Sequence, residues 1–368
     1  MNKGIAISEI TTYLESLAPL ALQENYDNSG LQTGNPSDII HSVILTIDVT
    51  EEVVDEAIEK NAGLIIAHHP VIFSGLKRIT GNNMAERILI KAIQNRIAIY
   101  AAHTNLDNIT GGVNTKIARL LGLEHQKILK PAGSLLRKMV TFVPTSEADK
   151  VRQALFDAGA GHIGNYDHCS FNLEGSGTFR GNTETNPYVG EKGKTHTEPE
   201  IRLETIYPVY LERRVITALL QAHPYEEVAY DLYPLENRWE KTGAGIVGTL
   251  PSPVDETVFL ESLRKVFGTP SIRHSQLLGK EVRTVAVCGG AGSFLLNDAI
   301  AAKADFFITG DIKYHQFFDA SRKLVMADIG HFESEQFTKE LFLELLTKKF
   351  STFAVHLSEV NTNPVHYY

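Results

Sequence analysis

The feature that most constrains this chain is an alternation of short apolar runs with amphipathic segments in its first and last thirds. Residues 42–50 (SVILTIDVT) and 63–70 (GLIIAHHP) are typical of strands, and Thr50 is placed to cap a helix over residues 51–60. The alternation resumes after residue 235. Because apolar strands joined by helices pack as a mostly parallel sheet with helices on its faces, the sequence predicts an α/β fold in three α/β/α layers.

A stretch of different character interrupts this alternation. Between about residues 131 and 235 the segments read strand, helix, strands, helix, strand, with a region rich in Gly, Thr and Asn in the middle. That order is typical of a small ferredoxin-like α+β unit. We therefore expect a discontinuous α/β main domain, residues 1–130 and 236–368, with an inserted α+β domain of residues 131–235.

Composition and charge argue against several classes of protein. The 368 residues carry a formal net charge of −9 and no block of Lys and Arg, so nucleic acid, whose binding depends on neutralising phosphates, is not an expected partner. No apolar run approaches the roughly 20 residues needed to cross a bilayer, so no membrane partner is expected. The two cysteines, Cys169 and Cys288, form no CxxC pair, which argues against a thiolate zinc site. The chain starts with an amphipathic segment rather than an export signal, which predicts a cytoplasmic location.

Metal-type ligands stand where three of the apolar runs stop. The segments are IIAHHP, YAAHTNLD and MADIGHFESE. In open α/β sheets the carboxyl ends of the strands line a common crevice, so side chains that are remote in sequence converge there. We therefore predict the metal ligands His68, His69, Asp107, His331 and Glu335.

The spacing of these residues favours two ions. His331 and Glu335 are four residues apart and share one face of a helix that begins near His331, so Glu335 could bridge two ions. Pro70 restricts His69 to extended geometry, so His68 and His69 could each face a different ion. Three imidazoles and two carboxylates suit Zn, Fe, Mn, Co or Ni better than Ca or Mg. We expect two divalent metal ions per chain that share and activate a water molecule.

Each segment also has a purely structural interpretation. The His-His pair could be structural, HTNLD could be a turn with Asp107 as a cap, and GHFESE could be a helix start with acidic residues at its positive end. The joint occurrence of all three at strand ends favours the metal site.

Further polar residues lie near these segments. His103 could orient a ligand or act as a general base. In TGDIKYH, Lys313 and His315 could hold a phosphate or stabilise developing charge, whereas Asp311 could instead cap the next helix and leave the others in solvent. The loop CGGAGS could offer backbone N–H groups to an anion or form a tight turn. We name His103 and His315 as candidate catalytic residues.

The chain resembles a known family almost end to end, the GTP cyclohydrolase I type 2-like proteins, also called NGG-interacting-factor-like dinuclear metal proteins. The motifs that carry the resemblance are, in chain order, YDNSGLQTG, AHHP, HTNLDN, CGGAGS, ITGDIKYH, GHFESE and NTNPV. The resemblance implies the same five metal ligands, with Glu335 bridging, and a ring-shaped homohexamer whose site opens to an internal cavity. It also implies that the insertion, including HPYEEVAYD, is a nitrogen-regulatory PII-like or CutA-like domain of the kind that trimerises and caps the ring.

These observations favour a hydrolase and leave two alternatives. A bridging water would attack a nucleotide or another phosphate- or amide-bearing small molecule, with His103 or His315 moving the proton. The family name implies GTP cyclohydrolase activity, but no GxxxxGK[ST] phosphate loop is present and no pattern reads guanine. The alternatives are a metal-binding regulatory or assembly protein whose ring is the functional object, and a metal-delivery protein with exchangeable ions.

Overall fold

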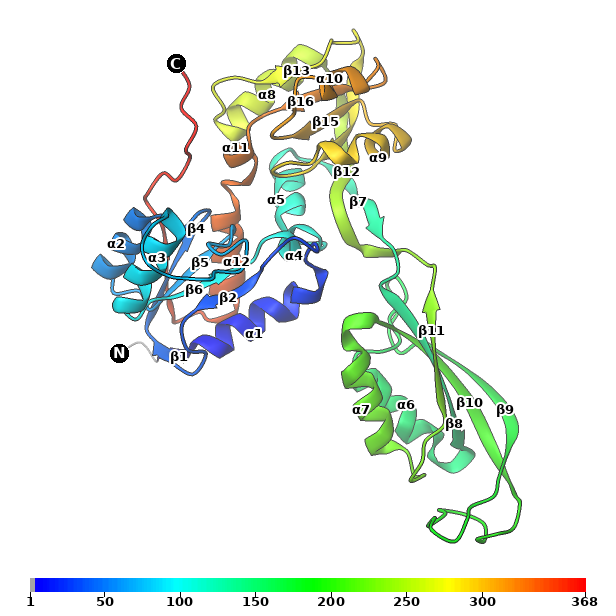
Figure 1. Cartoon of the computed structure of the whole chain (residues 1–368). Helices are drawn as coiled ribbons and strands as arrows, with labels where there is room; N and C mark the ends of the chain where they lie inside the picture. Colours follow the sequence, from blue (N-terminus) through cyan, green and yellow to red (C-terminus); the bar gives the residue numbers. More distant parts are fainter. Residues whose placement is uncertain (1–3) are drawn as a thin grey trace. The chain divides into compact units, whose positions relative to one another are not determined.

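The computed structural model describes residues 4–368 and divides into two compact units. The larger unit comprises Met1–Lys130 and Thr242–Tyr368, and the smaller one is Pro131–Lys241. In Figure 1 the larger unit is coloured blue to cyan at its N-terminal part and yellow to red at its C-terminal part, and the smaller unit is green.

The first sheet of the larger unit combines N-terminal strands with one strand from the end of the chain (Figure 1). Its strands are, in spatial order, β17 (Ala354–Leu357), β4 (Ser42–Thr46), β5 (Leu64–Ala67), β6 (Ala98–Ala101) and β2 (Gly30–Thr33). The first four are parallel, and β2 closes the edge antiparallel to β6. A two-stranded ribbon of β1 (Ile5–Ala6) and β3 (Ile39–Ile40) lies before β4 in the chain.

Helices cover both faces of this sheet. They are α1 (Ile7–Leu17) and α12 (Thr338–Lys349) on one face, and α2 (Glu51–Glu59) and α3 (Met84–Gln94) on the other. Successive side chains of a strand point to opposite faces, so Leu45 packs in the first core and Ile44 in the second. Burial on both faces explains why these strands are almost entirely apolar. The predicted cap of α2 is confirmed, because Thr50 Oγ1 accepts the N–H of Val53 at 3.3 Å.

The second sheet of the larger unit also has a parallel centre. Its strands are, in spatial order, β13 (Arg273–His274), β16 (Val325–Asp328), β15 (Phe306–Thr309), β14 (Glu281–Val287), β12 (Trp239–Asp255) and β7 (Glu124–Ala132). The helices packed on it are α5 (Val113–Leu120) and α8 (Glu256–Phe267) on one face and α9 (Leu296–Ala301) on the other. β14, β15 and β16 run parallel, whereas β12 is antiparallel to β14 and β13 is antiparallel to β16.

In each of the two sheets, the chain makes three turns at the edge where the parallel strands have their carboxyl ends. In the first sheet these turns follow β4, β5 and β6, and in the second they follow β14, β15 and β16. Short helices begin shortly after three of the six strands, namely α4 (Thr104–Asp107), α10 (Gln316–Asp319) and α11 (His331–Glu335). The predicted ligand segments lie in these turns.

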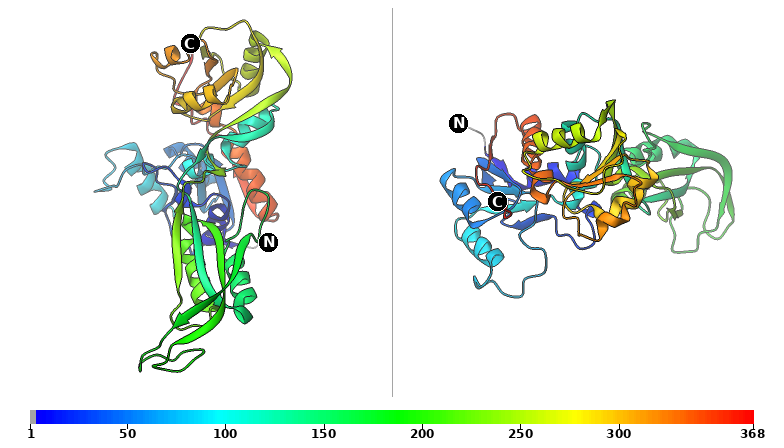
Figure 2. Two further views of the ribbon diagram at one scale, coloured as in Figure 1. Left: turned by 90° about the vertical axis from the view of Figure 1, so that its right-hand side faces the viewer. Right: turned by 90° about the horizontal axis from the view of Figure 1, so that it is seen from above.

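The smaller unit is an antiparallel sheet with two helices on one face (Figure 2). Its strands are, in spatial order, β11 (Tyr230–Leu235), β8 (Leu136–Pro144), β10 (His196–Pro208) and β9 (Ser170–Phe179). Its helices, α6 (Ala148–Asp157) and α7 (Glu212–Ala222), pack through Val151 and Leu219 on Met139 and Leu203 of the sheet. The opposite face of the sheet carries no helix among the described residues.

The predicted mixture of helices and sheets is confirmed. The residues HTNLDN form the turn of α4, because the N–H groups of Leu106 and Asp107 bond to His103 O at 2.8 and 3.1 Å. The residues after Gly330 form two separate helices, because α11 ends at Glu335 before α12 starts at Thr338. In the part of the chain that is described, no helix has the length and apolar character to span a bilayer. The assignment of the smaller unit to the PII-like or CutA-like class stays a prediction.

Candidate metal centre

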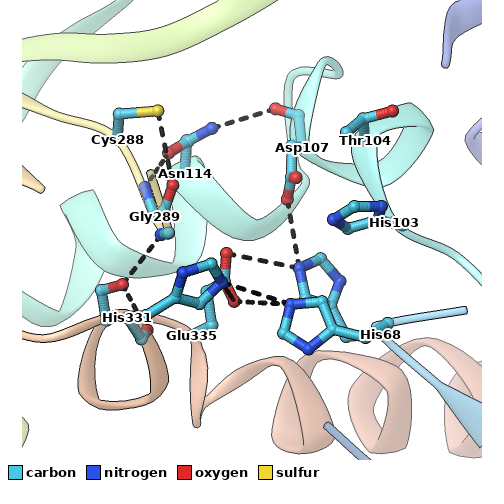
Figure 3. A network of polar contacts seen from close by, with 12 residues as sticks. His68, His103, Thr104, Asp107, Asn114, Cys288, Gly289, His331 and Glu335 are labelled. Atoms are coloured by element: carbon cyan, nitrogen blue, oxygen red, sulfur yellow. Dashed lines mark hydrogen bonds and ion pairs between the residues drawn. The ribbon is translucent and has the colours of Figure 1, made fainter. Parts of the chain in front are cut away.

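The five predicted ligands come together in one cluster. Figure 3 labels four of them, His68, Asp107, His331 and Glu335. His68 and His69 directly follow β5, and Asp107 is the last residue of α4, which follows β6. His331 and Glu335 are the first and last residues of α11, so they lie one helical turn apart on the same side. Because these ligands follow the carboxyl ends of strands, the fold brings their remote segments into contact.

Each imidazole of the cluster has its Nδ1 atom held by an acceptor. The pairs are His68 with Ala102 O at 2.9 Å, His69 with Asp48 Oδ1 at 2.7 Å, His103 with Asp27 Oδ1 at 2.8 Å, and His331 with Asp311 Oδ2 at 2.7 Å. A carbonyl or carboxylate at Nδ1 keeps the proton there and fixes the ring. This is the arrangement found behind metal-binding histidines, because it leaves Nε2 as the donor atom.

The Nε2 atoms and two carboxylates face one another at distances typical of donors around an ion. Glu335 Oε1 lies 3.6 Å from His68 Nε2, and Glu335 Oε2 lies 3.1 Å from both His69 Nε2 and His331 Nε2. Asp107 Oδ1 lies 3.7 Å from His68 Nε2. Two donors at roughly 2.1 Å from one ion and at the tetrahedral angle are about 3.4 Å apart. The groups His68–Asp107–Glu335 and His69–His331–Glu335 each have the ligand atoms for one ion, and Glu335 belongs to both.

Several donor atoms of the cluster are buried without a hydrogen bond. His68 Nε2, Asp107 Oδ1 and Glu335 Oε2 have no such partner among the described residues. Glu335 Oε2 is close to two imidazoles, but their alignment is not that of a hydrogen bond. Because buried polar atoms in proteins are nearly always paired, these three atoms indicate a missing partner, and a cation is the partner that would satisfy them together.

The charges of the cluster shift the pKa values of its members. Burial opposes the charged form of His69, but the carboxylates of Asp48 and Glu335 raise the pKa of its imidazole to about 10. Burial also opposes the charged form of His331, but the carboxylates of Glu335 and Asp311 raise the pKa of its imidazole to about 9. Burial raises the pKa of Asp107, whereas the surrounding imidazoles outweigh burial at Glu335 and hold its pKa well below the usual value. Without metal the cluster therefore retains protons on its imidazoles at neutral pH.

The glycine loop after β14 is a structural element that leaves room for the ligands. The N–H groups of Gly289, Gly290 and Gly292 donate to Asn114 Oδ1, Ser334 Oγ and Thr309 Oγ1 at 2.8–2.9 Å, so they are not available to an anion. Gly290 has φ +59°, and a Cβ there would lie 2.4 Å from Glu335 Oε1 and 3.2 Å from His331 Nε2. The tight-turn alternative for CGGAGS therefore describes the structure.

The structure brings His103 to the cluster and leaves His315 away from it. The ring centroid of His103 is 5.2 Å from that of His68 and 5.3 Å from that of His69. His315 is exposed, and its ring contacts are with Tyr314 and Phe318. Asp311 neither caps α10 nor faces an anion with Lys313, because its carboxylate holds His331.

Three aspartates hold imidazoles of the cluster in contacts that the sequence patterns did not reveal. They are Asp27, Asp48 and Asp311. Burial opposes the charge of Asp27, but hydrogen bonds from His103 and Thr104 keep its pKa well below the usual value. Asp48 and Asp311 each stand two residues past a strand, so a search for acidic residues at strand ends would have found them.

A cavity of about 620 Å³ opens beside the cluster and is lined by His69, His103, Asp107, His331 and Glu335. The side chains of Phe73, Met84 and Phe294 form an apolar part of its wall. No Lys or Arg is among the described residues that line it. The cavity thus offers donor atoms at one end and apolar or aromatic surface at the other, as small-molecule sites do.

Comparison with known proteins places the chain in one family. The profile of the Duf34/NIF3 (NGG1p interacting factor 3) family matches residues 5–364. The chain belongs to this family. The resemblance seen in the sequence motifs is therefore confirmed.

Two bacterial relatives match along nearly their whole length. The chain is 40% identical over 371 residues to a Bacillus subtilis protein, and the match covers 99% of each of the two chains. It is 41% identical over 355 residues to a Halalkalibacterium halodurans protein, and this match covers 95% of each chain. Both relatives are named GTP cyclohydrolase 1 type 2 homolog. A Bacillus cereus crystal structure described as related to NIF3 superposes with a TM-score of 0.84 at 42% identity and covers 100% of both chains.

We predict that Gly290→Ala weakens metal binding by at least about tenfold, because the new methyl group displaces Glu335 and His331. Gly279→Ala is a matched control, since Gly279 has a similar φ of +68° but open space around its Cβ position. Competition with a chromogenic chelator measures both affinities. Equal affinities of the two variants would contradict the predicted crowding of the ligands.

We also predict that metal loading at pH 7 releases on the order of two protons per chain, because His69 and His331 are protonated in the metal-free site. Apparent metal affinity should therefore rise as the pH is raised from 6 to 8. Isothermal titration calorimetry in two buffers of different ionisation enthalpy measures the release. Identical heats in both buffers would refute it.

Proposed function

We propose that the protein is a dinuclear metal-dependent hydrolase of a small molecule. One divalent ion would be held by His68, Asp107 and Glu335, and the other by His69, His331 and Glu335. The observation that carries this proposal is that His68 Nε2, Asp107 Oδ1 and Glu335 Oε2 converge, buried and without hydrogen-bond partners. The imidazoles of His68, His69 and His331 are each fixed from behind through Nδ1.

The chain's own residues would prepare the reaction around those ions. Two ions that share a water lower its pKa and supply a nucleophile near neutral pH. Glu335, 3% exposed and placed between three Nε2 atoms, fixes the spacing of the two sites. His103 has its Nδ1 proton directed to Asp27, so its Nε2 lone pair can accept a proton from water or substrate at the edge of the cluster. His315 is exposed and is a weaker candidate for this role.

The cavity supports a substrate with one polar reacting end and one apolar or aromatic part. The polar end would face the ions, and a planar ring could lie against Phe73 or Phe294. Since no Lys or Arg lines the cavity among the described residues, negative charge on the substrate would be compensated by the ions. We propose a nucleotide or a related small molecule, the class that the relatives' name GTP cyclohydrolase 1 type 2 homolog also indicates.

A second candidate is a metal-binding regulatory or assembly protein, favoured by the smaller unit. This unit has a cavity of its own of about 590 Å³. Its edge strand β9 exposes Phe171 and Leu173, which are 64% and 55% exposed, as an interface between subunits would. We propose that the chain forms a homo-oligomer, a hexameric ring in the cytoplasm, with a PII-like or CutA-like unit at its openings. Light scattering of the purified protein tests the hexamer.

Turnover separates these candidates. A hydrolase converts a member of a nucleotide panel at a rate that chelation abolishes and added metal restores. A regulatory protein binds a partner in a metal-dependent way without turnover, and a metal-delivery protein exchanges its ions rapidly with a free chelator.

We predict that His69→Ala and Glu335→Gln each remove at least one ion per chain together with any turnover. The reason is that each substitution removes a metal-ligand atom from the group His69–His331–Glu335. The controls are His274→Ala and Glu261→Gln, two exposed residues outside the cluster. Elemental analysis of protein purified without chelator gives the metal content. Retention of two ions per chain in either variant would show that the ligand assignment is wrong.

We predict that His103→Ala keeps both ions but lowers turnover by roughly 10²- to 10⁴-fold, the contribution of a general base. Steady-state rates of the metal-loaded wild-type and variant proteins provide the measurement. Loss of one ion in this variant would make His103 a metal ligand instead.

A further inference from the structure

The smaller unit has a cavity on the sheet face that its helices leave open. The residues of β10 alternate, so that Leu203 packs with the helices while Glu200 and Arg202 line the cavity of about 590 Å³. The excursion between β9 and β10 returns over this face, and the N–H of Asn186 donates to Glu226 Oε1 at 2.8 Å. The cavity thus lies between the sheet and a folded-back segment of the same unit.

The floor of this cavity is a glycine stretch that makes room for one carboxylate. Gly175 and Gly177 on β9 lie opposite Glu200 and Glu198 on β10. A Cβ at Gly177 would lie 2.1 Å from Glu200 Oε2, so any other residue there would displace the carboxylate. The glycines of β9 therefore provide the space that the buried Glu200 carboxylate of β10 occupies.

Glu200 is a buried charge without a positive partner. The residue is 7% exposed, and its Oε1 accepts a hydrogen bond from Tyr225 Oη at 2.8 Å. Among residues 4–368, Glu200 makes no ion pair and its Oε2 accepts no hydrogen bond. The nearby Arg202 instead bonds through Nε to Glu204 Oε1 at 2.9 Å. A carboxylate removed from water in this way is costly unless a cation arrives from outside.

Aromatic rings stand around the same space. The ring of Tyr225 lies 5.8 Å from Phe179 at 60° and 6.2 Å from Tyr188 at 52°, measured between centroids. All three line the cavity. Because the faces of aromatic rings carry negative potential, rings set at such angles around a carboxylate attract a cation with apolar substituents.

We propose that this cavity binds a small organic cation, an alkylated or primary ammonium group, between the Glu200 carboxylate and the rings of Phe179, Tyr188 and Tyr225. A metal ion fits less well, because no group of three metal-type ligands among the described residues lies in this unit. The charged residues that line the cavity are mostly acidic, with four glutamates (Glu174, Glu200, Glu226 and Glu227) against two arginines (Arg180 and Arg202). This excess of negative charge opposes an anion. The site is separate from the metal centre and does not depend on the proposed hydrolysis.

The test uses the full-length, metal-loaded protein with tetramethylammonium chloride as the probe. Its neutral isostere, tert-butanol, and NaCl at the same ionic strength are the ligand controls. Isothermal titration calorimetry should show saturable binding of tetramethylammonium and of n-butylammonium, but not of tert-butanol. No saturable binding, or equal binding of the neutral isostere, would overturn the proposal.

Three variants locate the site. Glu200→Gln should weaken binding at least about tenfold, and Phe179→Leu, which keeps an apolar side chain but removes the ring, should weaken it severalfold. Glu147→Gln, in the same unit but outside the cavity, should bind as wild type. Without ligand, Glu200→Gln should unfold at the same temperature as wild type or higher, because the amide carries no uncompensated charge. Undiminished binding in this variant would place the cation elsewhere and overturn the assignment.

Discussion

The carboxylate of Glu335 is the constraint around which the larger unit is organised. It is almost completely buried, and its two oxygens lie within 3.6 Å of the Nε2 atoms of three histidines from both ends of the chain. Such a cluster of donors cannot be left dry and unpaired without a large cost in free energy. The metal-free chain compensates with protons, as the raised pKa values of His69 and His331 show. Divalent ions would replace those protons and satisfy the same atoms.

The rest of the unit keeps these donors in place from several directions. Asn114 connects the two halves of the site, because its amide donates to Asp107 O at 3.1 Å and accepts the N–H of Gly289 at 2.9 Å. The end of the chain contributes as well, since Thr362 Oγ1 donates to Asp48 Oδ2 at 2.9 Å, and Asp48 in turn holds His69. The position of each ligand is therefore set by contacts that span almost the whole sequence.

Much of this site could be predicted from the sequence because ligand type and strand end are local properties. AHHP stops an apolar run, and His331 and Glu335 have helical spacing, so a metal site could be inferred before any fold was known. The contact of Asp48 with His69 could not be predicted, because it depends on β4 and β5 becoming neighbours in the sheet. The place of His315 could not be predicted for a related reason. This residue stands near a strand end like the others, but the turn after β15 directs Asp311 to the cluster and leaves His315 exposed.

The fold shows the same division between local and long-range information. The apolar runs predicted the central strands, and the position of Thr50 predicted the cap of α2. The pairing of β17 with β4 depends on how α12 crosses the first sheet, and nothing in AVHL specifies that partner. The helical turn of α4 could not be predicted from periodicity, because it is only four residues long and is held by bonds to His103 O.

The most direct test of the dinuclear site is anomalous diffraction from crystals of the protein loaded with zinc. We expect two anomalous peaks roughly 3.5–4 Å apart, one on either side of the Glu335 carboxylate, the first near His68 and Asp107 and the second near His69 and His331. A single peak, or peaks away from Glu335, would contradict the assignment of two ions bridged by this residue.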